Sequence, residues 1–170
     1  MGLLLPADRA LYDRSNDPIA GAPGCRTHDI VYPDLRTTNG WDSSYKIDVT
    51  RPCAQAHIDS LAAQFANWGY DLLKLDGVGP GSDKTGSQYD NTTDVKAWHD
   101  AIERTGRRMQ LVLSWSLDPA HIADWQRYSD GWRFDQDVEC YCKTLVRWNR
   151  AVVQRFHDLP HWVALTGPQG

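Results

Sequence analysis

The sequence predicts an α/β fold in which strands and helices alternate, and three observations support this prediction. After residue 53, short apolar runs typical of buried strands alternate with amphipathic runs that have helical spacing. Repeated strand–helix units of this kind form a parallel sheet with helices on its faces. Several strand-like runs end in polar side chains, and no GxGxxG or GxxxxGK[ST] motif is present. We therefore expect part of a (β/α)8 TIM barrel, with about four strand–helix units, rather than a doubly wound sheet.

The first third of the chain predicts one strand and a long loop. Residues 2–5 read as a strand of the barrel, whereas residues 6–53 lack strong periodicity and are rich in Pro, Gly, Asp, Asn and Thr. A loop of this length is uncommon within a domain and is usually functional or disordered. Because it also carries several aromatic side chains, we expect a long βα loop over the mouth of a barrel, with a short hairpin near residues 45–49.

The middle of the chain is expected to form a helix, a strand, a helix and a strand in turn, over residues 54–68, 70–76, about 94–105 and 109–114. Gly69 and Gly106 end the two helices. Thr92 or Thr93 is the expected cap of the second helix. Within the strand over 70–76, side chains alternate between the two faces, so the aliphatic side chains point outward to the helices and the charged ones point inward.

The last part of the chain predicts a short helix opened by Pro119 and ending near residue 128, a strand over 131–137 and a helix over about 141–157. Four strands are half of what a closed barrel of about 250 residues requires. We therefore interpret residues 1–170 as part of a single barrel domain, whose missing strands a longer chain would supply. Made alone, such a chain is expected to be unstable or to self-associate, because two sheet edges stay open.

The composition limits the classes of partner. A net charge of −4 and a pI near 5.8 argue against a nucleic-acid partner held through its phosphates. No stretch of the sequence approaches the length of a membrane span. The apolar start lacks the basic flank and the long apolar run of a signal peptide, so no localisation is assigned.

The four cysteines are Cys25, Cys53, Cys140 and Cys142, and they form no CxxC motif. No histidine stands at zinc-like spacing from them. A bridge between Cys140 and Cys142 would be strained, so their partners are expected elsewhere. Cys25 and Cys53 could pair and close a long loop, while free buried thiols are the alternative.

Charged side chains gather at two expected strand ends. Lys74 and Asp76 share one face of their strand, and Arg133, Asp135 and Asp137 share one parity in theirs. Two carboxylates that face each other across a barrel mouth can cleave a glycosidic bond, one as the nucleophile and the other as the acid and base. The neighbouring cations would keep the nucleophile ionised and donate hydrogen bonds to sugar hydroxyls.

Three other readings of these residues stay open. A lysine and an aspartate at a strand end can be a structural ion pair. Asp76, Asp135 and Asp137 could be oxygen ligands of Mg²⁺ in a metal-dependent barrel enzyme. The chain could also be a carbohydrate-binding remnant that keeps the pocket and has lost turnover.

Several segments resemble glycoside hydrolase family 27, the α-galactosidase and α-N-acetylgalactosaminidase group. Residues 68–77, WGYDLLKLDG, are similar to the nucleophile strand of that family, which follows the pattern W-G-[VY]-D-x-[LV]-K-x-D. Residues 132–137 resemble its acid/base segment, W-R-x-x-x-D. Residues 105–114 resemble the helix end and strand between the two, and residues 2–6 resemble an earlier strand, the third. The resemblance runs in register over residues 2–157.

The resemblance implies a role for each of four residues. Asp76 would be the nucleophile and Asp137 the general acid/base of a retaining double displacement, with the two carboxylates about 5–5.5 Å apart. Lys74 and Arg133 would bind sugar hydroxyls. Asp135, also a candidate substrate-binding residue, competes with Asp137 for the acid role because it has the same parity, and Asp137 is preferred because the resemblance places the acid/base there. The substrate would be a terminal α-galactosyl-type residue, and no cofactor or metal is implied.

Two departures from the family pattern leave the sugar open. Many members carry Glu or Cys-Glu-Trp at the end of the middle strand, where this chain has Ser114-Trp115-Ser116. That position helps to select the group at the second carbon of the sugar, which makes Trp115 and Ser116 candidate substrate-binding residues. The pair of Asp residues that follows the second strand in the family has no counterpart here. Soluble enzymes of this type are often exported.

Overall fold

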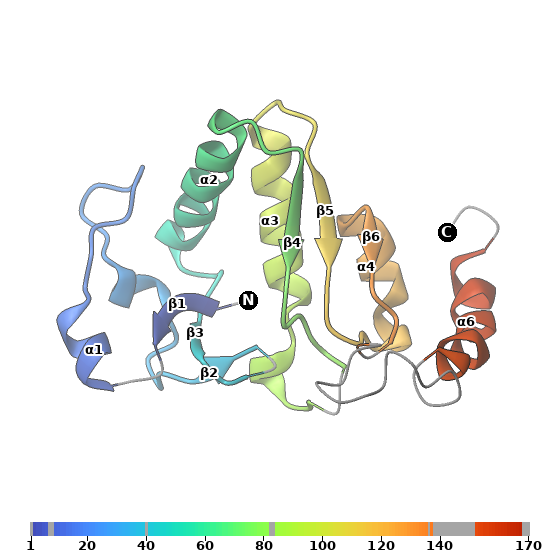
Figure 1. The fold of residues 1–170 in the computed structure, drawn as a ribbon. Coiled ribbons are helices and arrows are strands. Elements are labelled where there is room, and N and C mark those ends of the chain that lie inside the picture. The colour runs from blue at the N-terminus through green and yellow to red at the C-terminus, as the bar shows by residue number, and fades with distance from the viewer. Residues whose placement is uncertain are drawn as a thin grey trace.

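The computed structural model describes residues 2–6, 9–39, 41–81, 84–135, 137 and 152–167. These residues contain two small sheets, one antiparallel with the order β1-β3-β2 and one parallel with the order β4-β5-β6 (Figure 1). Two strands of the first sheet, β2 and β3, lie in the segment expected as a long loop, and β1 is the strand expected over residues 2–5. The second sheet belongs to the strand–helix repeats. The fold is therefore α/β, with a barrel only partly present.

The first 50 residues contain more regular structure than their composition predicts. Their elements are β1 (Gly2–Pro6), α1 (Arg9–Arg14), the 3-10 helix η1 (Thr27–Ile30), β2 (Thr37–Thr38) and β3 (Ser44–Lys46). β2 and β3 form the expected hairpin, although its second strand ends before residue 49. The expectation that the first strand lies in the barrel sheet is wrong, because β1 pairs antiparallel with β3. An apolar run predicts a strand, but it does not specify the partner of that strand.

The repeats form the parallel sheet and its helices. Their elements are α2 (Pro52–Asn67), β4 (Leu72–Leu75), η2 (Ser87–Tyr89), α3 (Thr92–Arg104), β5 (Gln110–Leu113), η3 (Pro119–His121), α4 (Ile122–Tyr128), β6 (Gly131–Trp132) and α6 (Val153–Thr166). β5 pairs parallel with both β4 and β6, which confirms the sheet type predicted from the alternation of elements.

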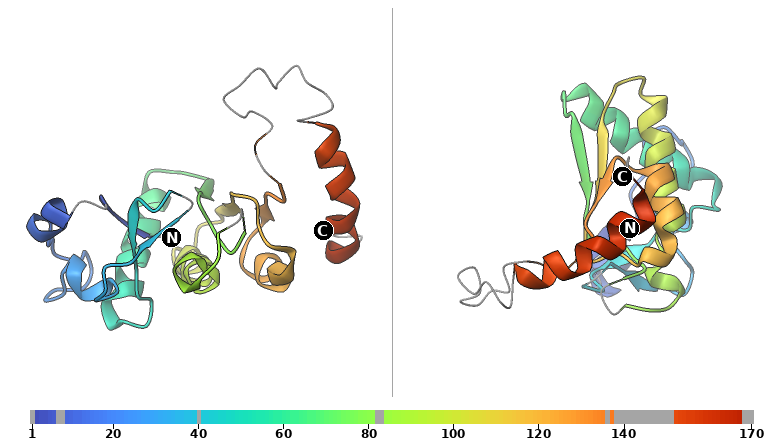
Figure 2. Two further views of the ribbon diagram at one scale, coloured as in Figure 1. Left: turned by 90° about the horizontal axis from the view of Figure 1, so that it is seen from below. Right: turned by 90° about the vertical axis from the view of Figure 1, so that its right-hand side faces the viewer.

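The main core lies between the parallel sheet and the helices α2, α3 and α4, which cover one of its faces (Figure 2). Ile58, Leu75, Leu111, Leu113 and Trp125 are almost completely buried there. Leu73 and Leu75 of β4 point to this core, whereas Leu72 and Lys74 are exposed on the other face. The strand therefore has the alternation predicted from its sequence, and its charged face is the uncovered face of the sheet.

Three boundaries differ from the predicted ones. α3 begins at Thr92 with Asn91 as its N-cap, so neither Thr92 nor Thr93 is the cap. The last strand ends at Trp132 rather than at residue 137, because the residues that follow turn toward charged partners described below. Most of the helix predicted over 141–157 lies outside the described residues, as do Gln136, Cys140 and Cys142, and the helix α6 continues to Thr166.

A disulfide joins Cys25 to Cys53, which decides between the two possibilities left open for these cysteines. It ties the irregular segment before η1 to the first turn of α2, across a sequence separation of 28. A second apolar cluster, with Tyr12, Ile30 and Tyr45 among its buried members, lies on the same side of the molecule. The segment before α2 is thus held by its own small core and a covalent bond.

A buried ion pair attaches the antiparallel sheet to α3. Lys46 of β3 and Asp94 of α3 are 5% and 3% exposed, and Nζ lies 3.1 Å from the carboxylate. The same ammonium donates to the carbonyl of Asp90 at 2.5 Å. Asn91 donates to Asp94 and to the hydroxyl of Thr38. These contacts fix the position of the β2–β3 hairpin relative to the parallel sheet.

Among the described helices, none is long and apolar enough to cross a membrane.

Candidate active site

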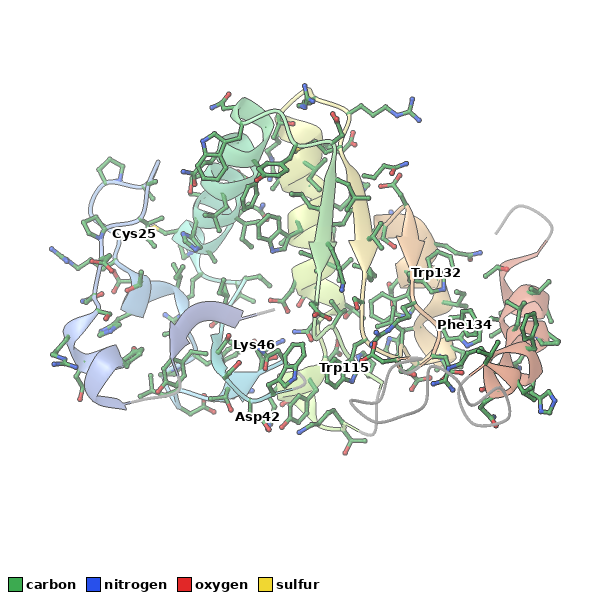
Figure 3. The ribbon with its side chains drawn as sticks, viewed as in Figure 1. Cys25, Asp42, Lys46, Trp115, Trp132 and Phe134 are labelled. Atoms are coloured by element: carbon green, nitrogen blue, oxygen red, sulfur yellow. A yellow bond between two sulfur atoms is a disulfide. The ribbon has the colours of Figure 1, made fainter. Side chains whose placement is uncertain are left out.

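The residues singled out from the sequence lie at the carboxyl ends of the three parallel strands. Asp76 follows β4, Ser114, Trp115 and Ser116 follow β5, and Arg133 follows β6. Because the strands are parallel and adjacent, these three ends share one edge of the sheet, where active sites of α/β barrels are found. In Figure 3, Trp115 lies at this edge, between Asp42 and Trp132.

At the end of β4, Lys74 and Asp76 form the pair that their spacing suggests. The ammonium Nζ of Lys74 lies 3.9 Å from the carboxylate of Asp76. Both side chains are about half exposed, at 54% and 48%. A pair exposed to this degree contributes little to stability, so its position invites a functional reading rather than a structural one.

Beyond β6, each of the two candidate acids has its own cation. Arg133 forms a charged hydrogen bond with Asp137, whose side chain is 55% exposed. Asp135 instead lies 3.3 Å from Arg155 of α6 and is only 16% exposed. Because the strand ends at Trp132, the shared parity of Arg133, Asp135 and Asp137 does not place them on one strand face. Asp135 and Asp137 therefore differ in their ion-pair partners and in their exposure, which their two-residue spacing in the sequence does not indicate.

The end of β5 carries an unusual backbone and a buried donor. Trp115 has φ at 104°, in the left-handed region that a bulky side chain rarely adopts and that often marks a functional site. Its indole Nε1 is buried and has no hydrogen-bond partner among the described residues, and the same is true of Arg133 Nε. Buried donors are normally paired, so these two donors have capacity for a further hydrogen bond at this edge of the sheet.

The loop after β4 approaches the end of β5 closely, and two glycines make this approach possible. A Cβ at Gly79 would lie 2.2 Å from the carbonyl oxygen of Tyr89, and one at Gly81 would lie 2.0 Å from that of Ser116. Gly81 also has φ at 145°. A small hollow lies beside this contact, and its walls include Gly77, Val78, Lys84, Tyr89 and Trp115.

The structure adds a group of residues that sequence spacing did not single out. The turn between β2 and β3 brings Trp41 against Trp115, with ring centroids 4.7 Å apart and an angle of 84° between the planes. Next to it, Asp42 accepts hydrogen bonds from Tyr89 and from Lys84, the latter at 3.2 Å. The aromatic content of the segment was the signal for a loop at the mouth, but these contacts join residues more than 40 positions apart.

The pKa of the Asp42 carboxyl is lowered by its two hydrogen-bond partners. The hydrogen bond from Tyr89, followed by that from Lys84, holds the pKa of Asp42 below its usual value, although partial burial opposes the shift. The carboxylate is therefore the stable form at neutral pH. Its contacts with Lys84 and Tyr89 are charge-assisted, which makes them stronger than neutral hydrogen bonds.

Within the described part of the chain, the structure contains no cluster of side chains of the kind that a metal site would require. No three His, Cys, Asp or Glu side chains among these residues are close enough together to hold an ion. Asp76, Asp135 and Asp137 thus do not form such a group.

Two curated proteins resemble the chain in sequence. α-Galactosidase 3 of Hypocrea jecorina is 33% identical over 125 residues, which are 71% of this chain and 20% of that protein. Putative α-galactosidase 8 of Emericella nidulans is 32% identical over 98 residues, or 55% of this chain and 19% of that protein. No family model matches the chain.

The fold resembles that of a solved glycosidase. A family 27 β-L-arabinopyranosidase from Geobacillus stearothermophilus matches with a TM-score of 0.73 and 26% identity, over 89% of this chain and 32% of that one. The chain is similar to family 27 glycoside hydrolases. A second structure of the same enzyme, in complex with arabinose, matches equally well. The family resemblance read from residues 68–77 and 132–137 is therefore confirmed.

The match to these similar proteins is partial on their side. This chain spans about a fifth of the length of the curated α-galactosidases and about a third of the arabinopyranosidase.

Proposed function

We propose that this chain carries the catalytic residues of a retaining glycoside hydrolase that removes terminal α-galactosyl-type residues. Asp76 is the nucleophile, and Asp137 is the general acid and then the general base. In the first step the carboxylate of Asp76 attacks the anomeric carbon while Asp137 protonates the leaving oxygen. In the second step Asp137 takes a proton from water, which attacks the same carbon and releases Asp76.

The observation that carries this proposal is the pairing of two accessible carboxylates with cations at one edge of the parallel sheet. Asp76 stands beside Lys74 after β4, and Asp137 stands beside Arg133 after β6, with β5 between them. Lys74 and Arg133 retain donors for sugar hydroxyls, since each cation has more N–H groups than these ion pairs use. The named activities of the relatives point to the same chemistry.

The environment of the acids favours Asp137 over Asp135 as the acid/base. Asp135 is largely enclosed and bound to Arg155, whereas the Asp137 side chain is more than half exposed. An acid/base residue must reach both the leaving group and the incoming water, which requires access. Trp115 and Ser116, at the end of the intervening strand, complete the set of substrate-binding residues we propose.

The test is hydrolysis of aryl α-galactosides and aryl β-L-arabinopyranosides by the protein expressed from its complete gene. Asp76→Ala should abolish turnover, and Asp137→Ala should lower it about 10²–10⁴-fold. Asp71→Ala is the matched control, because Asp71 is an exposed acid with an arginine partner, just before the amino end of the same strand. We expect that variant to keep full activity.

Two readouts separate this mechanism from its alternatives. The first sugar released should keep its anomeric configuration, as detected by NMR, and a chelator should leave the rate unchanged. Inversion of configuration would contradict the assignment of Asp76 as nucleophile. Chelator-sensitive turnover would favour the metal reading, and sugar binding without any turnover would favour a binding remnant.

A further inference from the structure

An exposed aromatic side chain at the carboxyl edge of the sheet belongs to the turn between β2 and β3. Trp41 is 56% exposed, although it contacts Trp115 edge to face. The planes of the two indoles meet at 84° and so form an open corner beside the carboxyl end of β5. A tryptophan that served only to cover Trp115 would lose most of its own exposure, because large aromatic side chains usually bury most of their surface.

The turn that carries Trp41 is held in place from both sides. The side-chain oxygen of Asn39 accepts hydrogen bonds from the backbone N–H of Trp41 at 3.0 Å and of Ser43 at 3.3 Å. On the other side, Lys84 and Tyr89 bind the carboxylate of Asp42. The exposed indole is thus positioned before any ligand arrives. Such preorganisation reduces the entropy lost on binding.

We propose that Trp41 is a substrate-positioning residue, whose indole packs against the apolar C–H face of the pyranose ring of the terminal sugar, and that Asp42 holds it there. This inference rests on the proposed function, because the acids at the neighbouring strand ends are what make the ligand a glycoside. An aromatic face suits a pyranose, since a sugar presents ring C–H groups on one face and hydroxyls around its edge. The indole supplies apolar contact, and the polar residues of the strand ends bind the hydroxyls.

Kinetics with the protein expressed from its complete gene test the inference. Trp41→Ala should raise KM for an aryl α-galactoside about tenfold and leave kcat nearly unchanged, because stacking stabilises substrate and transition state alike. Trp41→Phe should restore most of the affinity, whereas loss of a merely structural side chain would change the melting temperature instead. Asp42→Asn should raise KM in the same direction, since it weakens the anchor of the turn.

The matched control is Trp68→Ala. Trp68 is 63% exposed, just before the amino end of β4, so it is an equally accessible tryptophan far from the carboxyl edge. Its removal should not change KM. If Trp41→Ala leaves KM within about twofold of the wild type, or if Trp68→Ala raises KM as much, the inference is wrong.

A binding measurement keeps this inference separable from the proposed function. If Asp76→Ala abolishes wild-type turnover while Trp41→Ala has no effect, the function stands and the role of Trp41 falls. If the wild type hydrolyses nothing, calorimetric titration with galactose and L-arabinose decides. Binding weakened about tenfold by Trp41→Ala supports the positioning role, and equal binding overturns it. Absence of binding of either sugar by the wild type overturns both.

Discussion

Replacing Asp94 with alanine should destabilise the fold by about 3–5 kcal/mol, because it leaves the ammonium of Lys46 buried without its counter-charge. Both side chains are at most 5% exposed, and the remaining partner of Lys46 that we describe is the carbonyl of Asp90. The expected loss is large because water cannot reach the ammonium in place of the lost carboxylate. It measures the cost of an unpaired charge, not the net contribution of the pair.

The same helix supplies the control. Lys96 and Asp100 of α3 form an exposed ion pair, with side chains 51% and 29% accessible. Asp100→Ala should therefore cost less than about 0.5 kcal/mol. Replacing both buried partners, with Lys46→Met and Asp94→Leu together, should recover most of the stability lost in Asp94→Ala, since no buried charge then remains.

Urea denaturation of the protein expressed from its complete gene measures these differences, with the free energy of unfolding extrapolated to water. The three variants form a series in which only Asp94→Ala should shift the midpoint strongly. A loss below about 1 kcal/mol for Asp94→Ala would refute the reasoning, because it would mean that Lys46 stays solvated or moves to water at little cost.

Three further predictions concern the disulfide, the glycine contact and a helix histidine. The Cys25→Ser and Cys53→Ser double variant should lose about 3–4 kcal/mol in urea denaturation, given the 28-residue separation, and an unchanged midpoint would contradict this estimate. Gly81→Ala should lower kcat/KM sharply, because its Cβ meets the carbonyl of Ser116. Gly21→Ala, at another positive φ but in open space, should leave the kinetic constants unchanged. Burial lowers the pKa of His57 below 6.5, so the folded protein binds fewer protons than the unfolded chain there. The stability that neutral His57 contributes is full above pH 6.5 and is lost as pH falls below it, and His57→Gln should flatten that part of a melting-temperature profile.

The parallel region could be predicted from sequence because its signals are local. Helical spacing in residues 54–68 and the alternation of Leu73, Lys74, Leu75 and Asp76 reflect burial on one face, which is a property of each element alone. These elements were predicted within a few residues of their observed bounds. The carboxyl-edge location of Asp76 follows from the same logic, since parallel strands end on one side.

What the sequence could not predict depends on partners distant along the chain. The charged alternation at 133, 135 and 137 suggested a longer strand, but Asp135 is bound to Arg155 and the strand stops at Trp132. The pairing of β1 with β3 has no local signature either. The residues next to Asp42 in the sequence do not indicate that it binds Lys84 and Tyr89, which lie more than 40 positions away. Sequence analysis therefore did not single out Trp41, beside Asp42, as a site residue.

The attachments of the β2–β3 hairpin imply an order of assembly. Thr38 bonds to residues 50 and 53 positions further along the chain, and Lys46 pairs with a residue 48 positions away. The loops that these contacts close are long, and their closure is entropically costly until α3 and the loop before it exist to receive them. We therefore expect the parallel strands and their helices to form first and the hairpin to dock late. The contact between Trp41 and Trp115 would then be among the last parts of the site to form, after the strand ends that carry the acids.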